Sequence, residues 1–183
     1  MKFLRETSGG VCAPLGFKAG GIHCGIRKNK DKKDFALIVS DVPCAAAGVF
    51  TQNLVKGAPV LVTKRNIANG VAQAVICNSG NANTCNKDGE EVAEKMCALV
   101  TKVAGIDSSD VIVASTGVIG LPLDITPMAN AIGELYSSLS LNSDSAAEAI
   151  MTTDTVPKSV AVEFELGGKT CRIGAIAKGV GMI

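Results

Sequence analysis

Apolar residues along this chain change their spacing near residue 90, and this change constrains the fold more than any other feature of the sequence. Before that point they gather in short runs rich in β-branched residues. From Glu90 to Val103 they recur at helical intervals, with Glu and Lys between them, and Gly105 provides an end for the helix. A chain that combines short strands with amphipathic helices is predicted to form a layered α/β (α+β) fold.

The boundaries of the predicted elements follow from this spacing and from the turn-forming residues between apolar runs. We predict strands at Phe35–Val39, Ala47–Thr51, Pro59–Thr63, Gln73–Cys77, Val111–Ser115, Val160–Leu166 and Thr170–Ile176, the last two joined by a tight hairpin at 167–169. Besides the helix over 90–103, we predict helices at Ile125–Ser138 and Ser145–Met151. The sequence has no internal repeat and no low-complexity linker, so residues 1–183 are predicted to form a single region.

Composition narrows the class of function. Hydrophobic residues make up 47% of the sequence but aromatic residues only 3%, with no Trp, so the core must consist of Ala, Val, Ile and Leu. This favours an enzyme over a peptide- or sugar-binding surface, which usually presents aromatic rings. The net charge is +1, and the one dense cationic run, 27–33, also contains an Asp. We interpret that run as a solvated hairpin loop and predict no role in nucleic-acid binding.

The cysteines indicate the cellular compartment. The sequence has seven, irregularly spaced and without a CxxC pair, and its one histidine, His23, lacks further ligands at metal spacing. This favours free thiols in a reducing compartment and no zinc site. The first residues lack the apolar segment of a signal peptide, and no apolar run reaches membrane-spanning length. We therefore expect a soluble, cytoplasmic protein.

Thr116 and Gly117 lie at the end of a predicted strand, within 114–120. A strand that breaks into a Gly-containing turn leaves backbone N–H groups unpaired, and these can hold a developing oxyanion, with a Thr hydroxyl as a further donor. The alternative is an ordinary turn in which Gly117 supplies a positive φ. The motif alone does not decide between the two interpretations.

Three other polar features are open in the same way. Residues 152–155 supply three Thr hydroxyls and a carboxylate, which can bind an amino acid or form Asx and Ser/Thr turns. Residues 78–83 supply three Asn side chains, which can orient a ligand or satisfy their own loop. Lys178, beside a glycine, is either a surface residue or an anchor for a substrate carboxylate. One histidine supports no Ser-His-Asp or Cys-His arrangement, so spacing alone defines no reaction.

The sequence leaves its last predicted strand, passes two glycines and stops on apolar residues within 177–183. A natural C-terminus usually ends in polar residues. We therefore expect that the covalent chain once continued, or that its last residues are missing.

In combination, these motifs resemble one enzyme family. Over essentially all 183 residues, the sequence is similar to the N-terminal half of the ornithine acetyltransferase (glutamate N-acetyltransferase) family. The motifs that carry the resemblance are GGVCAPLGF (9–17), GIHCG (21–25), SDVP (40–43), AAAGVFT (45–51), NSGNAN (78–83), ASTGVIG (114–120), IMTTDT (150–155) and AKG (177–179).

The resemblance implies a precursor that cleaves itself before a Thr into an α-chain and a β-chain. The Thr that begins the β-chain would take the acetyl group from N2-acetylornithine, form an acyl-enzyme and pass the group to glutamate in arginine biosynthesis. It would need no cofactor, although some members also use acetyl-CoA, and the assembly would be an α2β2 heterotetramer. An N-terminal Thr supplies its own base through its α-amine, which agrees with a chain that has only one histidine.

The resemblance also implies residue roles. By motif position, Thr116 and Gly117 form the oxyanion hole, and Thr152 and Lys178 contact substrate, with Thr153 and Thr155 as alternatives to Thr152. The sequence departs from the family in two places. It has Val180 where members commonly have Ser, and it ends before the expected cleavage point, without the Pro-Asn-Met-Ala stretch or the Thr. The nucleophile must then come from another chain.

Two other functions stay open at this point. One is a self-processing amidase or aminopeptidase of similar architecture, in which water replaces glutamate as the acceptor. The other is a non-catalytic amino-acid-binding module, whose Thr and Asn clusters only hold a ligand.

Overall fold

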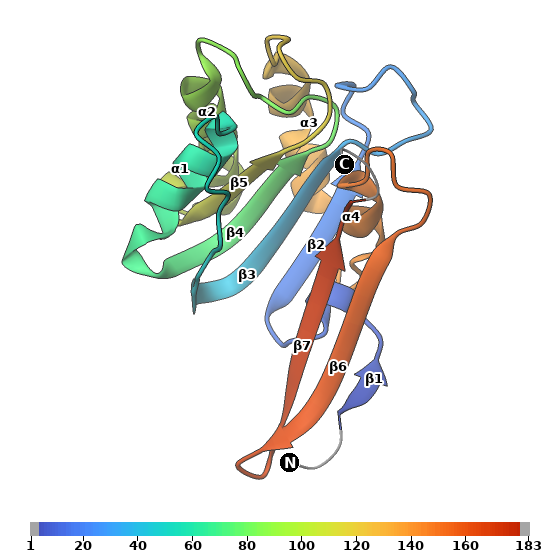
Figure 1. The fold of residues 1–183 in the computed structure, drawn as a ribbon. Helices are drawn as coiled ribbons and strands as arrows, with labels where there is room; N and C mark the ends of the chain where they lie inside the picture. The colour runs from blue at the N-terminus through green and yellow to red at the C-terminus, as the bar shows by residue number, and fades with distance from the viewer. Residues whose placement is uncertain (1–3, 180–183) are drawn as a thin grey trace.

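A computed structural model describes residues 4–179, which form a mixed α+β fold with two separate sheets (Figure 1). The larger sheet has the order β2 (Phe17–Ile22), β3 (Phe35–Ala45), β4 (Val71–Asn78), β5 (Val111–Ser115), and the smaller has the order β1 (Arg5–Thr7), β6 (Lys158–Leu166), β7 (Lys169–Ala177). The α-helices are α1 (Ala58–Asn66), α2 (Gly89–Ala104), α3 (Thr126–Ser137) and α4 (Asp144–Ala149). Between residues 4 and 179, no helix has the length and apolar character needed to cross a membrane.

The direction of the strands in the larger sheet determines where a ligand can bind. β2, β3 and β4 pair antiparallel, whereas β4 and β5 pair parallel, with α2 in the connection between them. In the parallel pair Asn78 lies opposite Ser115, so both strands end at the same edge. The loops that follow them therefore lie side by side, as they do where open parallel sheets bind ligands.

The larger sheet separates two cores. On one face α1, α2 and α3 cover large aliphatic side chains and one buried aromatic ring, and the fully buried members include Phe35, Leu37, Ile76, Met96 and Leu135. On the other face α4 packs on β2 and β3 through small residues, among them Ala19, Ala36, Ala146 and Ala149. Alternation along β3 sends neighbouring residues to opposite faces. β6 and β7, with β1, extend from this layered body as an arm (Figure 1).

β2 contains two glycines, of which Gly21 lies at the contact with α4 and Gly20 lies against the C-terminal end of α3. A Cβ on Gly21 would lie 2.1 Å from the Ser145 carbonyl oxygen and 2.8 Å from the Ala149 Cβ. Both neighbours belong to α4, so α4 can approach the sheet this closely only over a residue without a side chain. The glycine pair, which matches no nucleotide-binding pattern, thus has a packing role.

We expect Gly21→Ala to lower the free energy of unfolding by about 2 kcal/mol, the usual cost of overpacking a tight contact. Gly133→Ala is the matched control, because Gly133 lies in α3 and nothing within 4 Å would meet its Cβ. That substitution should stabilise the protein by roughly 0.5–1 kcal/mol, since Ala favours the helix. Urea unfolding of both variants measures the difference, and equal effects would contradict the close-packing argument.

Two of the predicted strands are wrong. Residues 46–57, which include the predicted strand Ala47–Thr51, form no strand or helix, and Pro59–Thr63 lies within α1. The β-branched run in Pro59–Thr63 suggested a strand, but Pro favours the first turn of a helix. The Thr63 hydroxyl also donates to the Val113 carbonyl oxygen at 2.7 Å, which ties this helix to β5.

The other predicted elements are confirmed, although β3 continues to Ala45, six residues beyond the predicted end at Val39. α2 ends at Ala104 and is capped by Gly105, which has a φ of 69° and donates its N–H to the Thr101 carbonyl. The hairpin turns through Gly167 and Gly168, with φ of 58° and 75°, the geometry that two-residue hairpin loops favour. Two strands, β1 and β2, were not predicted, because β1 is short and the glycines of β2 obscure its apolar pattern.

Candidate functional site

An open cleft of about 1340 Å³ lies at the edge where β4 and β5 end. Its walls come from the β2–β3 loop, from the loops after β4 and β5, from the segment after α4 and from the end of β7. All four of the residues predicted from the sequence line it, namely Thr116, Gly117, Thr152 and Lys178. The fold thus brings together side chains that are up to 62 residues apart in the sequence.

The Lys178 ammonium joins two of the predicted residues. Its Nζ donates to the Thr116 Oγ1 at 2.9 Å and to the Thr152 Oγ1 at 2.9 Å. A Thr hydroxyl has one hydrogen and two lone pairs. Because each oxygen accepts from the ammonium, each hydroxyl keeps its own hydrogen for a ligand. We call these three side chains the Lys–Thr cluster.

Gly117 adds a backbone donor beside the cluster. Its φ is 127°, and a Cβ would lie 2.5 Å from the Gly80 carbonyl carbon, so only glycine fits. The N–H of Thr116 donates to the Asn78 carbonyl at 3.0 Å, and the N–H of Val118 donates to the Gly80 carbonyl at 3.3 Å. Within residues 4–179 the Gly117 N–H has no such partner. The expectation of unpaired N–H groups at this turn is therefore wrong for Thr116 and Val118, whereas the Gly117 N–H is unpaired beside the cluster.

The structure also distinguishes the three Thr residues of 152–155. The Thr152 hydroxyl meets Lys178, whereas Thr153 is exposed at the wall of the cleft. Thr155 is exposed and does not line the cleft. The geometry therefore favours Thr152 as the contact residue.

The Asn-rich loop, residues 78–83, satisfies its own backbone. The Asn78 Oδ1 accepts from the N–H of Gly80 at 3.2 Å and of Asn81 at 3.0 Å, and the Asn81 Oδ1 accepts from the N–H of Asn83 at 2.8 Å. Asn83 adopts a positive φ of 46°, as Asn tolerates. The interpretation that this loop satisfies its own backbone is confirmed. The loop also packs against Gly117 through the Gly80 backbone.

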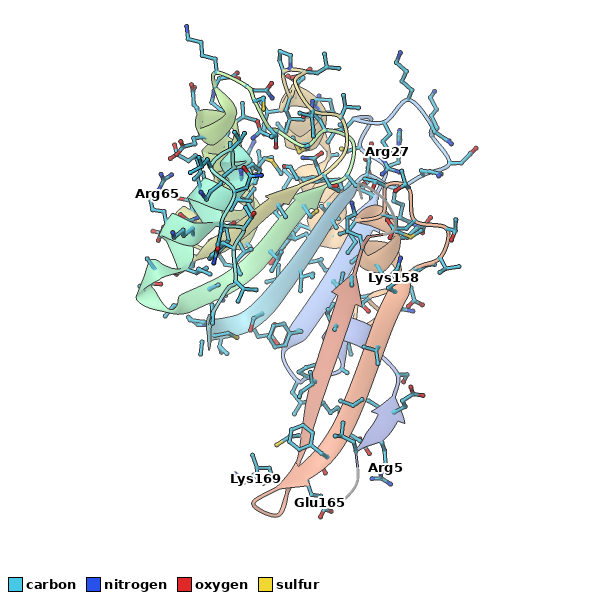
Figure 2. The ribbon with its side chains drawn as sticks, in the orientation of Figure 1. Arg5, Arg27, Arg65, Lys158, Glu165 and Lys169 are labelled. Atoms are coloured by element: carbon cyan, nitrogen blue, oxygen red, sulfur yellow. The ribbon has the colours of Figure 1, made fainter. Side chains whose placement is uncertain are left out.

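Arg27 is a site residue that the sequence analysis missed. The lysines of the β2–β3 loop at 28, 30 and 32 are exposed, as predicted, but the Arg27 guanidinium turns inward. It donates to the Ser79 carbonyl at 2.8 and 2.6 Å and also to the Met151 carbonyl, and burial lowers its pKa. Figure 2 shows Arg27 at the end of the sheet where this loop begins. Its place at the edge of a cationic run gave no sign of this role.

Asp154 is a second missed residue, although it belongs to the 152–155 motif. Its carboxylate is buried and accepts from the Gly179 N–H at 2.7 Å, from the Lys158 Nζ at 2.7 Å and from the Thr152 N–H at 3.2 Å. These donors hold the pKa of Asp154 well below its usual range, with the Gly179 N–H as the largest cause. The carboxylate is therefore ionised at neutral pH.

The charges around the cleft favour an anionic ligand. Arg27, Lys28, Lys32 and Lys178 line it, against the single carboxylate of Asp124. Within the described part of the chain, no group of three His, Cys, Asp or Glu side chains is placed to hold a metal ion. The donors that line the cleft include hydroxyl, amide and ammonium groups.

Two solved structures share this fold. The crystal structure of arginine biosynthesis bifunctional protein ArgJ from Bacillus halodurans has a TM-score of 0.92 and 38% identity, and the match covers 99% of this chain and 96% of that one. The crystal structure of ornithine acetyltransferase from Mycobacterium tuberculosis, complexed with ornithine, has a TM-score of 0.87 and 38% identity, covering 99% and 97%. The predicted α+β fold class is confirmed by these matches.

Sequence comparison gives the family. Residues 18–183 match the ArgJ family model, and the chain belongs to the ArgJ family. It is 50% identical over 179 residues to arginine biosynthesis bifunctional protein ArgJ of Symbiobacterium thermophilum and 45% identical over 183 residues to glutamate N-acetyltransferase of Methanocaldococcus jannaschii. These matches cover 96% and 98% of this chain but 44% of each relative, so the chain spans less than half the length of those proteins.

Proposed function

We propose that residues 1–183 are the α-chain region of an acetyltransferase that moves the acetyl group of N2-acetylornithine to L-glutamate in arginine biosynthesis. The observation that carries the proposal is the Lys–Thr cluster, in which one ammonium holds the Thr116 and Thr152 hydroxyls next to the Gly117 N–H. The names of the relatives, an ornithine acetyltransferase and a glutamate N-acetyltransferase, support the same activity.

The cluster suits a reaction through an acyl-enzyme. A Thr at the start of a second chain attacks the acetyl carbonyl with its Oγ, and its α-amine accepts the hydroxyl proton. The negative charge that forms on the carbonyl oxygen is stabilised by the Thr116 hydroxyl and the Gly117 N–H, which are two of the donors that the site leaves available. The amine of ornithine then leaves with the proton, and the amine of glutamate attacks the acyl-Thr through the same steps in reverse.

The charge of the cleft supports acidic acceptors. The residues that line the cleft include four cationic side chains and one carboxylate. This excess of positive charge favours a substrate with one or two carboxylates. Lys178, already held by two hydroxyls, has a third hydrogen with which it can bind a substrate carboxylate. Thr152 presents its hydroxyl hydrogen to the same ligand.

Exposed apolar side chains support the proposed β-chain partner. Val49, Leu54 and Val55 are exposed on the irregular segment 46–57, and Leu166 and Ile173 are exposed on the arm. Apolar side chains that gather on a surface can mark a site where another polypeptide binds. We propose that a β-chain from the same precursor covers them, that it carries the nucleophilic Thr, and that two such pairs form an α2β2 heterotetramer in the cytoplasm. The two departures from the family, at Val180 and at the end of the sequence, lie outside the described residues.

The test uses the protein expressed from its complete gene and incubated with N2-acetylornithine that carries an isotopically labelled acetyl group. Rapid acid quenching and mass spectrometry should find the label on the N-terminal Thr of a second polypeptide. Addition of unlabelled glutamate should then remove the label and produce labelled N-acetylglutamate.

Two outcomes would replace this function with its alternatives. Release of labelled acetate, unchanged by glutamate, identifies an amidase in which water is the acceptor. Tight calorimetric binding of an amino acid by residues 1–183 without a second polypeptide, together with no labelled Thr, identifies an amino-acid-binding module.

A further inference from the structure

Asp154 connects three segments that converge on the cleft. Its side chain is fully buried, and its three donors come from the segment after α4, from the start of β6 and from the residue that follows Lys178. Figure 2 shows Lys158 at the end of β6 nearest the body, far from Arg5, Glu165 and Lys169 at the tip of the arm. The buried carboxylate therefore lies where the arm joins the site.

Two of its three hydrogen bonds hold the backbone of site residues. The Thr152 N–H belongs to the residue whose hydroxyl accepts from Lys178, and the Gly179 N–H directly follows Lys178 in the chain. Asp154 thus fixes the backbone on both sides of the Lys178–Thr152 hydrogen bond. Because Lys178 also holds Thr116, any displacement of the ammonium changes the direction of the Thr116 hydroxyl.

Neutralisation of the Asp154 charge does not explain why Asp154 also accepts two backbone hydrogen bonds, because its ion pair with Lys158 already neutralises it. Glu163 of β6, for comparison, has ion pairs with Arg5 and Arg172 and does not line the cleft. In addition to its ion pair with Lys158, Asp154 accepts hydrogen bonds from backbone N–H groups with both oxygens. Oδ2 accepts from Thr152, and Oδ1 accepts from Gly179 as well as from Lys158. Carboxylates that accept such backbone bonds are strongly held in one orientation.

We infer that Asp154 is a positioning residue, which holds Lys178 and Thr152 so that the Thr116 hydroxyl points at the reacting acetyl group. This inference rests on the proposed acetyltransferase function. Asp154 is buried and does not line the cleft, and it acts through Lys178.

The first test needs no activity. Lys178 should react slowly with an amine-acetylating reagent, because its ammonium is engaged by two hydroxyls. In Asp154→Asn, used in the protein from its complete gene, we expect labelling of Lys178 to become roughly fivefold faster, as the loss of about one net hydrogen bond predicts. Peptide mass spectrometry at fixed times measures the rate. Should Asp154→Asn not fold, Asp154→Glu, which shifts the carboxylate by one methylene, must show the same acceleration.

The second test asks whether Asp154 acts through Lys178. We expect Asp154→Asn to lower kcat for acetyl transfer roughly 10- to 100-fold, with a smaller change in KM, because a misdirected Thr116 affects mainly the transition state. The double variant Asp154→Asn, Lys178→Met should be no slower than Lys178→Met alone, since residues that act as one unit are not additive. Glu163→Gln is the matched control and should keep the kcat of the unmodified protein.

The outcomes separate the two proposals. An unmodified protein that transfers no acetyl group refutes the function but leaves the labelling result to decide the role of Asp154. An unchanged labelling rate of Lys178, or fully additive losses in the double variant, overturns the positioning role. A lowered melting temperature of Asp154→Asn with an unchanged kcat per folded molecule also overturns it, because it shows a merely structural carboxylate.

Discussion

Thr116→Val should lower kcat for acetyl transfer roughly 100- to 1000-fold, the cost that removal of one oxyanion donor typically has. The substitution removes the hydroxyl of a residue that lines the cleft but leaves the Thr116 N–H bonded to the Asn78 carbonyl, so the turn keeps its backbone contact. KM should change less than kcat, since the oxyanion exists only in the transition state and intermediate. Steady-state transfer of acetyl from N2-acetylornithine to glutamate measures both constants.

Thr116→Ser is the control, because it retains the hydroxyl that accepts from Lys178 and donates to the ligand. It should keep kcat within about tenfold of the unmodified protein, as the donor survives with a looser rotamer. A Thr116→Val protein that folds and turns over at the same rate as Thr116→Ser would show that the hydroxyl does not stabilise the reaction. Stabilisation of the oxyanion would then rest on other donors of the site, such as the Gly117 N–H.

The sequence predicted elements well where their periodicity extended over many residues. The apolar spacing of α2 and the Gly-Gly turn of the hairpin specify one local structure each, and both are confirmed. The prediction of a strand at Pro59–Thr63 was wrong because its β-branched residues are compatible with a strand. Packing on β5 and the Pro at the first turn favour a helix instead. β2 was missed because its apolar pattern is interrupted by Gly20 and Gly21, which allow close packing against the end of α3 and against α4.

The residues of the candidate site also include some that the sequence predicted and others that it did not. Thr116, Gly117, Thr152 and Lys178 were predicted from motifs that resemble a known family, and the structure brings all four to one cleft. Spacing alone left each of them with a plainer alternative, because no local rule states that Lys178 reaches residues 26 and 62 positions away. Arg27 and Asp154 were missed for a related reason, since each bonds to a backbone group of a distant segment, Ser79 for Arg27 and Gly179 for Asp154.

Gly117→Ala should have the most severe effect on the protein itself. A Cβ at this position would lie 2.5 Å from the Gly80 carbonyl carbon, 2.6 Å from its oxygen and 2.8 Å from the Asn81 nitrogen. All three are backbone atoms, and the Asn78 side chain holds their segment in place. Together with a φ of 127°, this overpacking should lower the free energy of unfolding by about 4 kcal/mol.

Gly120→Ala separates the cost of the positive φ from the cost of the steric overlap with neighbouring backbone atoms. Gly120 lies in the same loop with a φ of 78°, but nothing within 4 Å would meet its Cβ. It should lose only about 1 kcal/mol, the conformational part alone. Urea unfolding measures the stabilities, and kcat of the folded fraction should fall more than about 100-fold in Gly117→Ala because the loop must move the Gly117 N–H away from the acetyl oxygen. If the two variants matched in stability and in kcat, the close contact of Gly117 with Gly80 would have no part in forming the donor.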